Sequence, residues 1–380
     1  MPKYDYIIIG AGAAGLLLAN ALGNDSFFSD KSILILDKDD KSKNDRTWCF
    51  WEKGAGDFNG LLFKNWPHIF FGGQDLSLSS SIAPYRYKML QGIDFYEEYK
   101  LRLKKYSNIQ WVQDEVLQIQ ENGVAVTVST QTDQFLGKQV FNSIFDFKAV
   151  KTQQKYPVLQ QHFLGWFVTT PKPVFNPNEA TFMDFSIPQK GNTRFMYVLP
   201  FSETEALVEY TLFSENLLEK SEYEEAIEDY LKNKLGCEDF EIAEREQGSI
   251  PMTSYQFHKH NSNGVFNIGI AGGWAKPSTG FTFYNTHKQV KRLVNRIKLD
   301  KTLTGLHQKK RFWFYDLLLL DILYKQNHLG SSIFESLFKR RKPQLILKFL
   351  EEETSVWEDL QIIWACPKRP FLKALWNRLF

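Results

Sequence analysis

The fold is decided by the stretch YDYIIIGAGAAG, residues 4–15, together with the two apolar segments after it. Its apolar first half is typical of a buried strand, and its glycines are typical of a turn. The next segment, Leu16–Gly23, is typical of a short apolar helix. A second apolar run, Ile33–Leu36, ends on Asp37. Strand, glycine turn, helix, strand and terminal acid form the βαβ unit that binds a dinucleotide. The sequence therefore predicts an α/β fold that begins with a Rossmann-type unit.

The three glycines of this turn have separate physical roles. Gly10 permits the tight turn, Gly12 removes a Cβ so that the backbone can approach a pyrophosphate, and Gly15 lets helix and strand pack closely. The helix N-terminus offers unpaired N–H groups and a positive dipole end to the phosphates, and Asp37 can accept hydrogen bonds from an adenosine ribose. A turn that serves packing alone is the alternative, but the complete unit favours a bound dinucleotide.

A second glycine-rich element lies far along the chain, with the sequence GIAGGWAKPSTGF at residues 269–281. A buried strand predicted at Val265–Ile270 leads into it, and a long helix predicted at Phe281–Ile297 comes after it. The positive end of that helix, aimed at the pyrimidine edge of a flavin, would stabilise an anionic reduced flavin. An ordinary Gly/Pro loop is the alternative. Because the first unit stands at the very start of the chain, FAD is favoured over NAD.

Between these two elements the pattern changes to strands separated by Pro, Asn and Gly turns, which predicts an antiparallel sheet. We expect its strands at 165–169, 181–185, 194–199 and 206–213, after a buried strand at Phe141–Phe147. This organisation divides the chain into four regions. Residues 1–150 form the first part of the FAD-binding fold, 151–262 the antiparallel substrate domain, 263–300 the return to the FAD-binding fold, and 301–380 a helical region.

Composition limits the function classes. The 380 residues hold 46 Lys+Arg against 44 Asp+Glu, which argues against a nucleic-acid binder. Three scattered cysteines give neither a disulfide framework nor a zinc pattern, and the seven histidines provide no metal-binding spacing. We therefore expect no metal and a reducing, cytoplasmic compartment. Aromatic residues reach 15%, which suits large apolar clefts as well as cores.

The last 80 residues differ from the rest in charge, with a net +6 against −4 for residues 1–300. Basic clusters at Lys309–Arg311, Lys339–Lys342 and Lys368-Arg369 alternate with apolar helices rich in Phe, Leu and Trp. An interfacial helix needs this segregation of cationic and apolar groups to meet a membrane surface. A helical cap with solvated lysines is the alternative. We expect peripheral association with a membrane.

Several segments, in order over about residues 4–290, resemble the FAD-dependent lycopene cyclases. They are NDRTWCFW at 44–51, FMDF at 182–185, YVLPFS at 197–202, LVEYT at 207–211, GSIPM at 248–252 and PSTGF at 277–281. Two positions depart from the family pattern. Tyr210 stands where an acid commonly follows the catalytic glutamate, which weakens a two-carboxylate mechanism. Lys276 stands where histidine is frequent, which leaves the flavin surroundings cationic.

The resemblance implies a lycopene β-cyclase, an isomerase on a fold similar to p-hydroxybenzoate-hydroxylase-type flavoproteins. Such enzymes convert the ψ end groups of lycopene into β-ionone rings, giving γ-carotene and then β-carotene, with reduced FAD and no net redox change. NADPH is the expected electron donor. Residues of this chain that the resemblance places at the cofactor, besides those of the first glycine turn, are Arg46, Gly273, Pro277, Ser278, Thr279 and Gly280.

The reaction needs an acid strong enough to protonate an alkene, and Glu209 is the candidate. Strand alternation places it on one face with Leu207, Thr211 and Phe213, and such neighbours favour a neutral, proton-donating carboxyl. A water-facing glutamate on an edge strand is the alternative. Trp274 and Phe281 are candidates for the substrate pocket by position.

Two other functions stay open from the residues. One is an FAD-dependent monooxygenase, halogenase or reductase acting on an isoprenoid substrate. The other is a flavoprotein that binds a carotenoid or lipid without catalysis, in which Glu209→Gln would change nothing.

Overall fold

Seven strands form the first sheet of the computed structural model, which describes residues 1–306 and 311–379. The order is β8-β2-β1-β11-β10-β9, with β17 also paired to β11. Five of these strands are parallel, and β9 and β10 continue the sheet in antiparallel fashion. The strands are β1 Lys3–Ile9, β2 Ile33–Asp37, β8 Ile109–Gln113, β9 Val116–Glu121, β10 Val126–Thr130, β11 Gln134–Asn142 and β17 Val265–Asn267. With α1 (Ala13–Gly23) between β1 and β2, the predicted βαβ unit is present.

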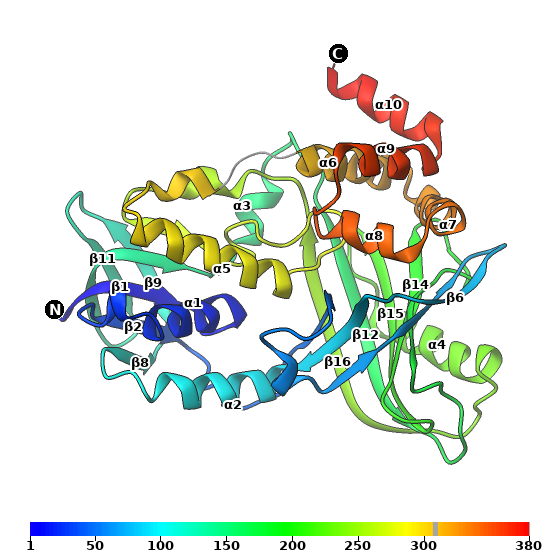
Figure 1. The fold of residues 1–380 in the computed structure, drawn as a ribbon, viewed down its shortest axis with the longest axis horizontal. Helices are drawn as coiled ribbons and strands as arrows, with labels where there is room; N and C mark the ends of the chain where they lie inside the picture. The colour runs from blue at the N-terminus through cyan, green and yellow to red at the C-terminus, as the bar shows by residue number, and fades with distance from the viewer. Residues whose placement is uncertain (307–310, 380) are drawn as a thin grey trace.

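Three helices cover this sheet: α1, α2 (Gly92–Leu103) and α5 (Phe283–Lys298). Their apolar sides share one core with β1 and β2. Figure 1 shows α1 and α5 side by side at the end of the molecule that carries the N-terminus. Because α5 comes directly after the second glycine-rich element, both glycine elements end at helices that pack against each other.

The predicted strand Phe141–Phe147 is wrong in its extent. β11 ends at Asn142, the side chain of Ile144 is half exposed, and Phe147 begins the short helix α3 (Phe147–Lys151). The strand instead begins at Gln134, where polar residues on its exposed side hid the apolar pattern. β17 is likewise shorter than the predicted Val265–Ile270, because the chain turns at Gly269 with φ +60°.

The second sheet is long and mostly antiparallel, in the order β16-β12-β15-β14-β13-β5-β6. Its strands are β16 Glu241–Met252, β12 Leu159–Thr169, β15 Glu205–Ser214, β14 Thr193–Pro200, β13 Glu179–Asp184, β5 His68–Gly72 and β6 Ser77–Ser81. Thus β5 and β6, from inside the stretch 1–150, join this sheet by a parallel pairing of β5 with β13. A three-stranded sheet stands beside it, made of β3 Thr47–Lys53, β7 Tyr85–Gln91 and β4 Lys64–Trp66.

The two faces of the long sheet pack against different partners. On the outer face, α4 (Lys220–Asp229) and the π-helical turn Tyr230–Lys234 after it bury side chains such as Tyr210 and Leu212. On the inner face, residues such as Leu207 and Phe213 share the largest core with the three-stranded sheet and the C-terminal helices. The inner face is therefore enclosed from two sides.

Five helices form the C-terminal region: α6 Arg311–Lys325, α7 Gly330–Arg340, α8 Pro343–Leu350, α9 Val356–Ala365 and α10 Lys368–Leu379. In Figure 1 they lie together above the long sheet, in orange to red. α6, α7, α8 and the buried side of α9, with Ile362 and Ala365, contribute to the inner core, whereas α10 lies outermost. Among the described residues, no helix has the length and apolarity needed to cross a membrane. Lys309 and Lys310 of the predicted basic cluster lie outside the described residues.

Candidate functional site

The first glycine turn leaves free space in front of α1. A Cβ added at Gly10 would lie 2.1 Å from Ser143 Oγ, and one at Gly15 would lie 1.9 Å from the Gly10 carbonyl oxygen. A Cβ at Gly12 would meet nothing within 4 Å, and no side chain caps the N-terminus of α1. The helix therefore presents its first N–H groups to an open position, which fits the pyrophosphate of a dinucleotide.

Asp37 lies at the end of β2, directly beside this turn. Its carboxylate accepts hydrogen bonds from the backbone N–H groups of Ala11 and, at 2.8 Å, Asp39, and Lys41 Nζ approaches to 3.4 Å. These bonds tie the turn to the end of the strand. They also hold the acid at the strand end where a ribose would follow the pyrophosphate.

The second glycine-rich element is anchored by an acid from α6. Lys276 Nζ lies 3.0 Å from Asp316 Oδ2, and Ser278 Oγ donates a 2.6 Å hydrogen bond to Asp316 Oδ1. Burial disfavours the charged ammonium, but the charges of Asp316 and Glu352 hold the pKa of Lys276 above its ordinary value. The lysine is thus ion-paired inside the protein, and its counter-charge comes from α6.

Unsatisfied polar atoms surround the turn at Gly280. Within the described part of the chain, Thr279 Oγ1 and Gln161 Oε1 are buried at this turn without a hydrogen-bond partner, and so is Trp274 Nε1 farther back in the same glycine-rich element. A Cβ at Gly280, whose φ is +70°, would lie 2.8 Å from Gln161 Oε1. Because Gln161 is on β12, the element rests against the inner face of the long sheet. Buried polar atoms of this kind fit a group with a hydrogen-bonding edge, such as a flavin.

Glu209 lies on β15 and points to the inner face, as its alternation with Leu207 and Phe213 predicts. Its side chain is buried, 8% exposed, and Thr211 Oγ1 donates a hydrogen bond to one carboxylate oxygen. Burial, helped by the charge of Glu246 and opposed by the Thr211 hydrogen bond, raises the pKa of Glu209 to about 8. The water-facing alternative is therefore wrong. A carboxyl in this state keeps its proton at neutral pH.

A second carboxyl lies in the same transverse row of the sheet. Gly165 on β12 pairs with Glu209 on one side and with Glu246 of β16 on the other. Thr47 Oγ1, at the start of β3, donates a 2.6 Å hydrogen bond to Glu246 Oε2. Burial raises the pKa of Glu246 to about 7, opposed by this hydrogen bond and by the charge of Arg46. Arg46, itself exposed, thus acts on Glu246 from the segment just before β3.

Aromatic rings continue the row beyond Glu209. Tyr197 pairs with Glu209 across β14 and β15, and its hydroxyl hydrogen-bonds that of Tyr87. Tyr87 packs edge-on against Phe182, with ring centroids 5.5 Å apart, and Trp51 packs edge-on against Phe281 at 4.6 Å. Phe281, predicted for the substrate pocket, therefore belongs to the aromatic group beside Glu209.

Trp274 occupies a different place. It is buried in the core of the dinucleotide-binding end, and it lines a cavity of about 140 Å³ together with Gly273 and Pro277. A smaller cavity of about 30 Å³ lies between Trp51, Phe281 and Lys276. The structure thus separates the two aromatic residues that the sequence grouped: Phe281 faces the Glu209 side and Trp274 the glycine-rich element.

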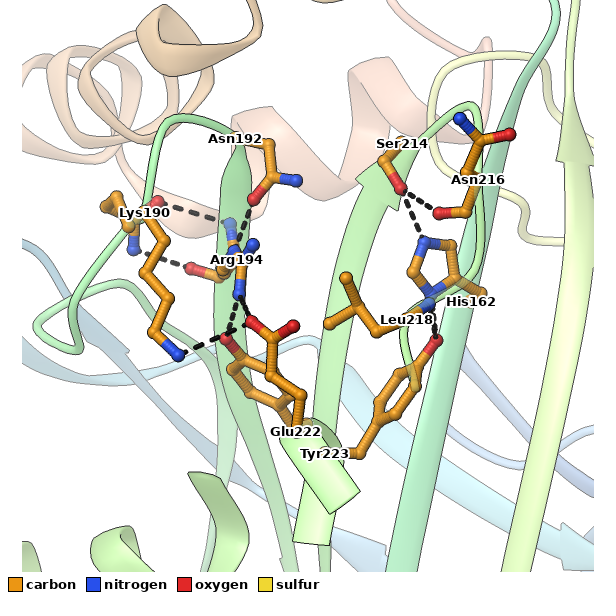
Figure 2. Close-up of polar contacts among 11 residues, drawn as sticks. His162, Lys190, Asn192, Arg194, Ser214, Asn216, Leu218, Glu222 and Tyr223 are labelled. Carbon is orange, nitrogen blue, oxygen red and sulfur yellow. Dashed lines mark hydrogen bonds and ion pairs between the residues drawn. The ribbon is translucent and has the colours of Figure 1, made fainter. Parts of the chain in front are cut away.

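Tyr210 and its partners lie on the opposite face of the sheet from Glu209. Figure 2 shows this outer network, in which Arg194 bridges Glu222 at 2.6 Å and also donates to the Tyr210 hydroxyl at 3.0 Å. Beside it His162 bonds Ser214 and Tyr223, and burial lowers the pKa of His162 to about 4. These bonds fasten α4 to the sheet. An acid at position 210 would share no face with Glu209, so tyrosine there removes nothing from the site.

The family model for the lycopene cyclase protein family matches residues 5–376. The chain belongs to the lycopene cyclase family. Among curated relatives, the lycopene beta-cyclase of Paracoccus sp. (strain N81106 / MBIC 01143) is 25% identical over 291 residues, which cover 73% of this chain and 70% of that protein.

Solved structures with the same fold are flavoenzymes or resemble them. A geranylgeranyl bacteriochlorophyll reductase-like protein from Thermoplasma acidophilum superimposes with a TM-score of 0.62 at 13% identity, covering 99% of both chains. The flavin-dependent brominase Bmp2 gives a TM-score of 0.61 at 13% identity, covering 100% of both. At this identity the likeness concerns the fold alone. It confirms the predicted α/β flavoprotein fold. On this fold the chain places Glu209 and Glu246 in one transverse row of the long sheet, called the acidic row below.

Sequence reasoning missed Glu246, Thr47 and Gly165. In the sequence Glu246 belongs to the charged run Glu241–Gln247, which is typical of an exposed strand. The signal that could have found it is its place two residues before Gly248-Ser249-Ile250-Pro251-Met252, one of the segments shared with the family.

Proposed function

We infer that this chain is a lycopene β-cyclase of carotenoid biosynthesis. It would convert the ψ end groups of lycopene into β-ionone rings, by way of γ-carotene, to give β-carotene. The observation that carries this proposal is the buried carboxyl of Glu209, held protonated beside aromatic rings in a lycopene cyclase family member.

Cyclisation is an isomerisation that begins and ends with proton transfer. The Glu209 O–H bond breaks as a C–H bond forms on the terminal alkene, and the resulting tertiary carbocation is attacked by the neighbouring double bond. Loss of a different proton from the new ring gives the product. Rings such as Phe281 and Trp51 would stabilise the cation by about 0.5–2 kcal/mol each and exclude water, which would otherwise capture it.

FAD is the cofactor that we propose for the two glycine-rich elements. Gly10, Gly12, Gly15 and Asp37 would hold its pyrophosphate and ribose, a role supported by the open helix N-terminus. Arg46, Gly273 and the turn Pro277-Ser278-Thr279-Gly280 would hold its ring system, and the unpaired Thr279 Oγ1 and Gln161 Oε1 support this role for the turn. In reduced anionic form, generated by NADPH, the bound flavin would supply negative charge near the carbocation.

Lycopene resides in a bilayer, and we propose that α9 and α10 dock on an anionic membrane surface. Large apolar side chains are exposed on both helices, at positions 356, 357, 360, 363 and 364 of α9 and 372, 376 and 379 of α10. On α9 they follow helical spacing, while the acids Glu358 and Asp359 are paired with Lys348 and Arg311. Exposed Lys368, Arg369 and Lys373 border this face. Cations beside exposed tryptophans match anionic headgroups above acyl chains.

Expression in a host that accumulates lycopene tests the proposed function. We expect wild type to turn the red pigment orange-yellow, because ring closure shortens the conjugated system. Glu209→Gln should leave the pigment red, since an amide cannot donate the proton. The matched control is Glu241→Gln, an exposed glutamate at the start of β16, which should behave as wild type. Wild type that leaves lycopene unchanged, in cells where the folded flavoprotein is present, would refute the proposal.

A reaction under anaerobic conditions separates cyclisation from oxidation or reduction by the same fold. With pre-reduced FAD and lycopene in vesicles, we expect products of the same mass as the substrate and no consumption of NADPH per ring. NADPH oxidation in proportion to product would instead indicate a monooxygenase or reductase.

A further inference from the structure

Glu209 does not stand alone on the inner face of the sheet. Gly165 lies between Glu209 and Glu246 on the central strand, and each glutamate pairs with it directly. The α-carbons of Glu209 and Glu246 are two strand spacings apart, about 10 Å. A side chain on the residue between them, on the same face of the sheet, would keep the two carboxyls separate. Here the middle residue has no side chain.

The glycine is what joins the two carboxyls into one site. An alanine Cβ at position 165 would lie 3.3 Å from Glu246 Cγ, 3.5 Å from Glu209 Cβ and 2.8 Å from Leu207 Cδ1. Both glutamate stems thus already border the gap above the glycine. Each carboxyl also has a separate hydroxyl donor, Thr211 for Glu209 and Thr47 for Glu246.

The two environments favour different protonation states. Burial and the charge of Glu244 raise the pKa of Glu246, while the hydrogen bond from Thr47 of β3 and the charge of Arg46 oppose this and favour its carboxylate form. Glu209 lies among Leu207, Phe213 and the aromatic rings, and its burial there raises its pKa. The negative charge of Glu246 raises the pKa of Glu209 further. A pair of this kind holds one proton, on Glu209.

We propose that Glu246 is the second catalytic carboxyl, the base that removes the ring proton after closure. The inference rests on the proposed cyclase function. Glu209 gives its proton to the alkene, the ring closes, and the C–H bond on the new ring breaks as an O–H bond forms on Glu246. A proton then passes from Glu246 to Glu209 across the gap at Gly165, which restores the starting state. No electron is gained or lost.

The chemistry of the product tests this role better than activity alone. A cation that loses its base is deprotonated elsewhere or captured by water, so Glu246→Gln should lower the cyclisation rate by about 10²–10⁴-fold. The residual product should contain ε or γ rings or ring alcohols, whereas Glu209→Gln should form no ring of any type. The control is again Glu241→Gln, with flavin absorbance and melting temperature confirming the fold of each variant.

The outcomes are distinguishable from failure of the proposed function. If wild type cyclises lycopene and folded Glu246→Gln does so at an unchanged rate with β rings only, the second carboxyl has no catalytic role and the inference is overturned. If wild type forms no ring, the proposed function itself fails. Should Glu246→Gln not retain flavin, Glu246→Asp decides: a rate at least tenfold lower with β rings retained supports the role, and a wild-type rate refutes it.

Discussion

The chemistry of the acidic row depends on which of two nearby carboxyls holds the proton. Glu209 must be protonated and Glu246 ionised, and burial raises the pKa of both carboxyls, so kcat/KM should fall on either side of a bell whose two limbs lie above the ordinary range of glutamate. Among the groups that face the pair, burial raises the pKa of Cys49 to about 12 and holds those of Tyr87 and Tyr197 above their ordinary value, so none of these titrates in this range. Glu244 and Arg46 act as charges on Glu246.

Glu246→Gln gives this profile an internal check. Removing the negative charge beside Glu209 makes ionisation of Glu209 easier, so its pKa should fall and the alkaline limb should move to lower pH. The acid limb should disappear, because its titrating group is gone. An alkaline limb that stays in place would show that the two carboxyls do not interact, and the pair would then have to be abandoned.

Among the structural elements, the features that depend on residues close together in the sequence are predicted best. The glycine turn, the βαβ unit and the inward direction of Glu209 follow from neighbours within a few residues, and the structure contains all three. The pairing of Glu246 with Glu209 could not be predicted, since the two meet only through the strand order β16-β12-β15. Likewise the pairing of Lys276 with Asp316 joins residues 40 positions apart. No pattern in either segment indicates the other.

This ion pair between the second glycine element and α6 yields a stability prediction. Asp316→Asn removes the nearest counter-charge of the buried Lys276 ammonium, at 3.0 Å, and leaves Glu352 at 3.7 Å together with the charge of Glu351. The free energy of unfolding should drop by about 3–5 kcal/mol, as for a buried pair that loses one partner. Urea denaturation followed by flavin or tryptophan fluorescence measures it. The exposed pair Glu228–Lys232, between α4 and the π-helical turn after it, is the control, because Glu228→Gln should cost at most about 1 kcal/mol. Equal effects of the two substitutions would contradict the structural role of Asp316.

In the whole molecule, the glycine-rich elements and the C-terminal helices lie at opposite ends. The dinucleotide-binding end carries the N-terminus and both glycine elements, while the C-terminal helices close the inner face of the long sheet at the other end (Figure 1). Phe338 of α7, for example, stacks on Phe71 of β5 with ring centroids 4.1 Å apart. In the chain, α9 and α10 follow directly on α6, α7 and α8, which pack against the inner face of the long sheet that carries Glu209 and Glu246.

Because α6, α7, α8 and the buried side of α9 belong to the core, deleting the C-terminal region would expose that core, and point substitutions test membrane docking more cleanly. Trp357, Trp364 and Trp376 are 74%, 67% and 64% exposed, so replacing all three by serine should leave the fold intact. Each buried apolar side chain contributes about 1.5–3 kcal/mol when fully inserted, so even partial insertion predicts at least a tenfold loss of sedimentation with anionic vesicles. Serine at the exposed residues Leu101, Leu117 and Val124 of the dinucleotide-binding end is the matched control and should bind as wild type.

The triple tryptophan variant should still cyclise lycopene supplied in detergent micelles, since its acidic row is untouched. Unchanged vesicle binding by that variant would mean that α9 and α10 do not face the bilayer.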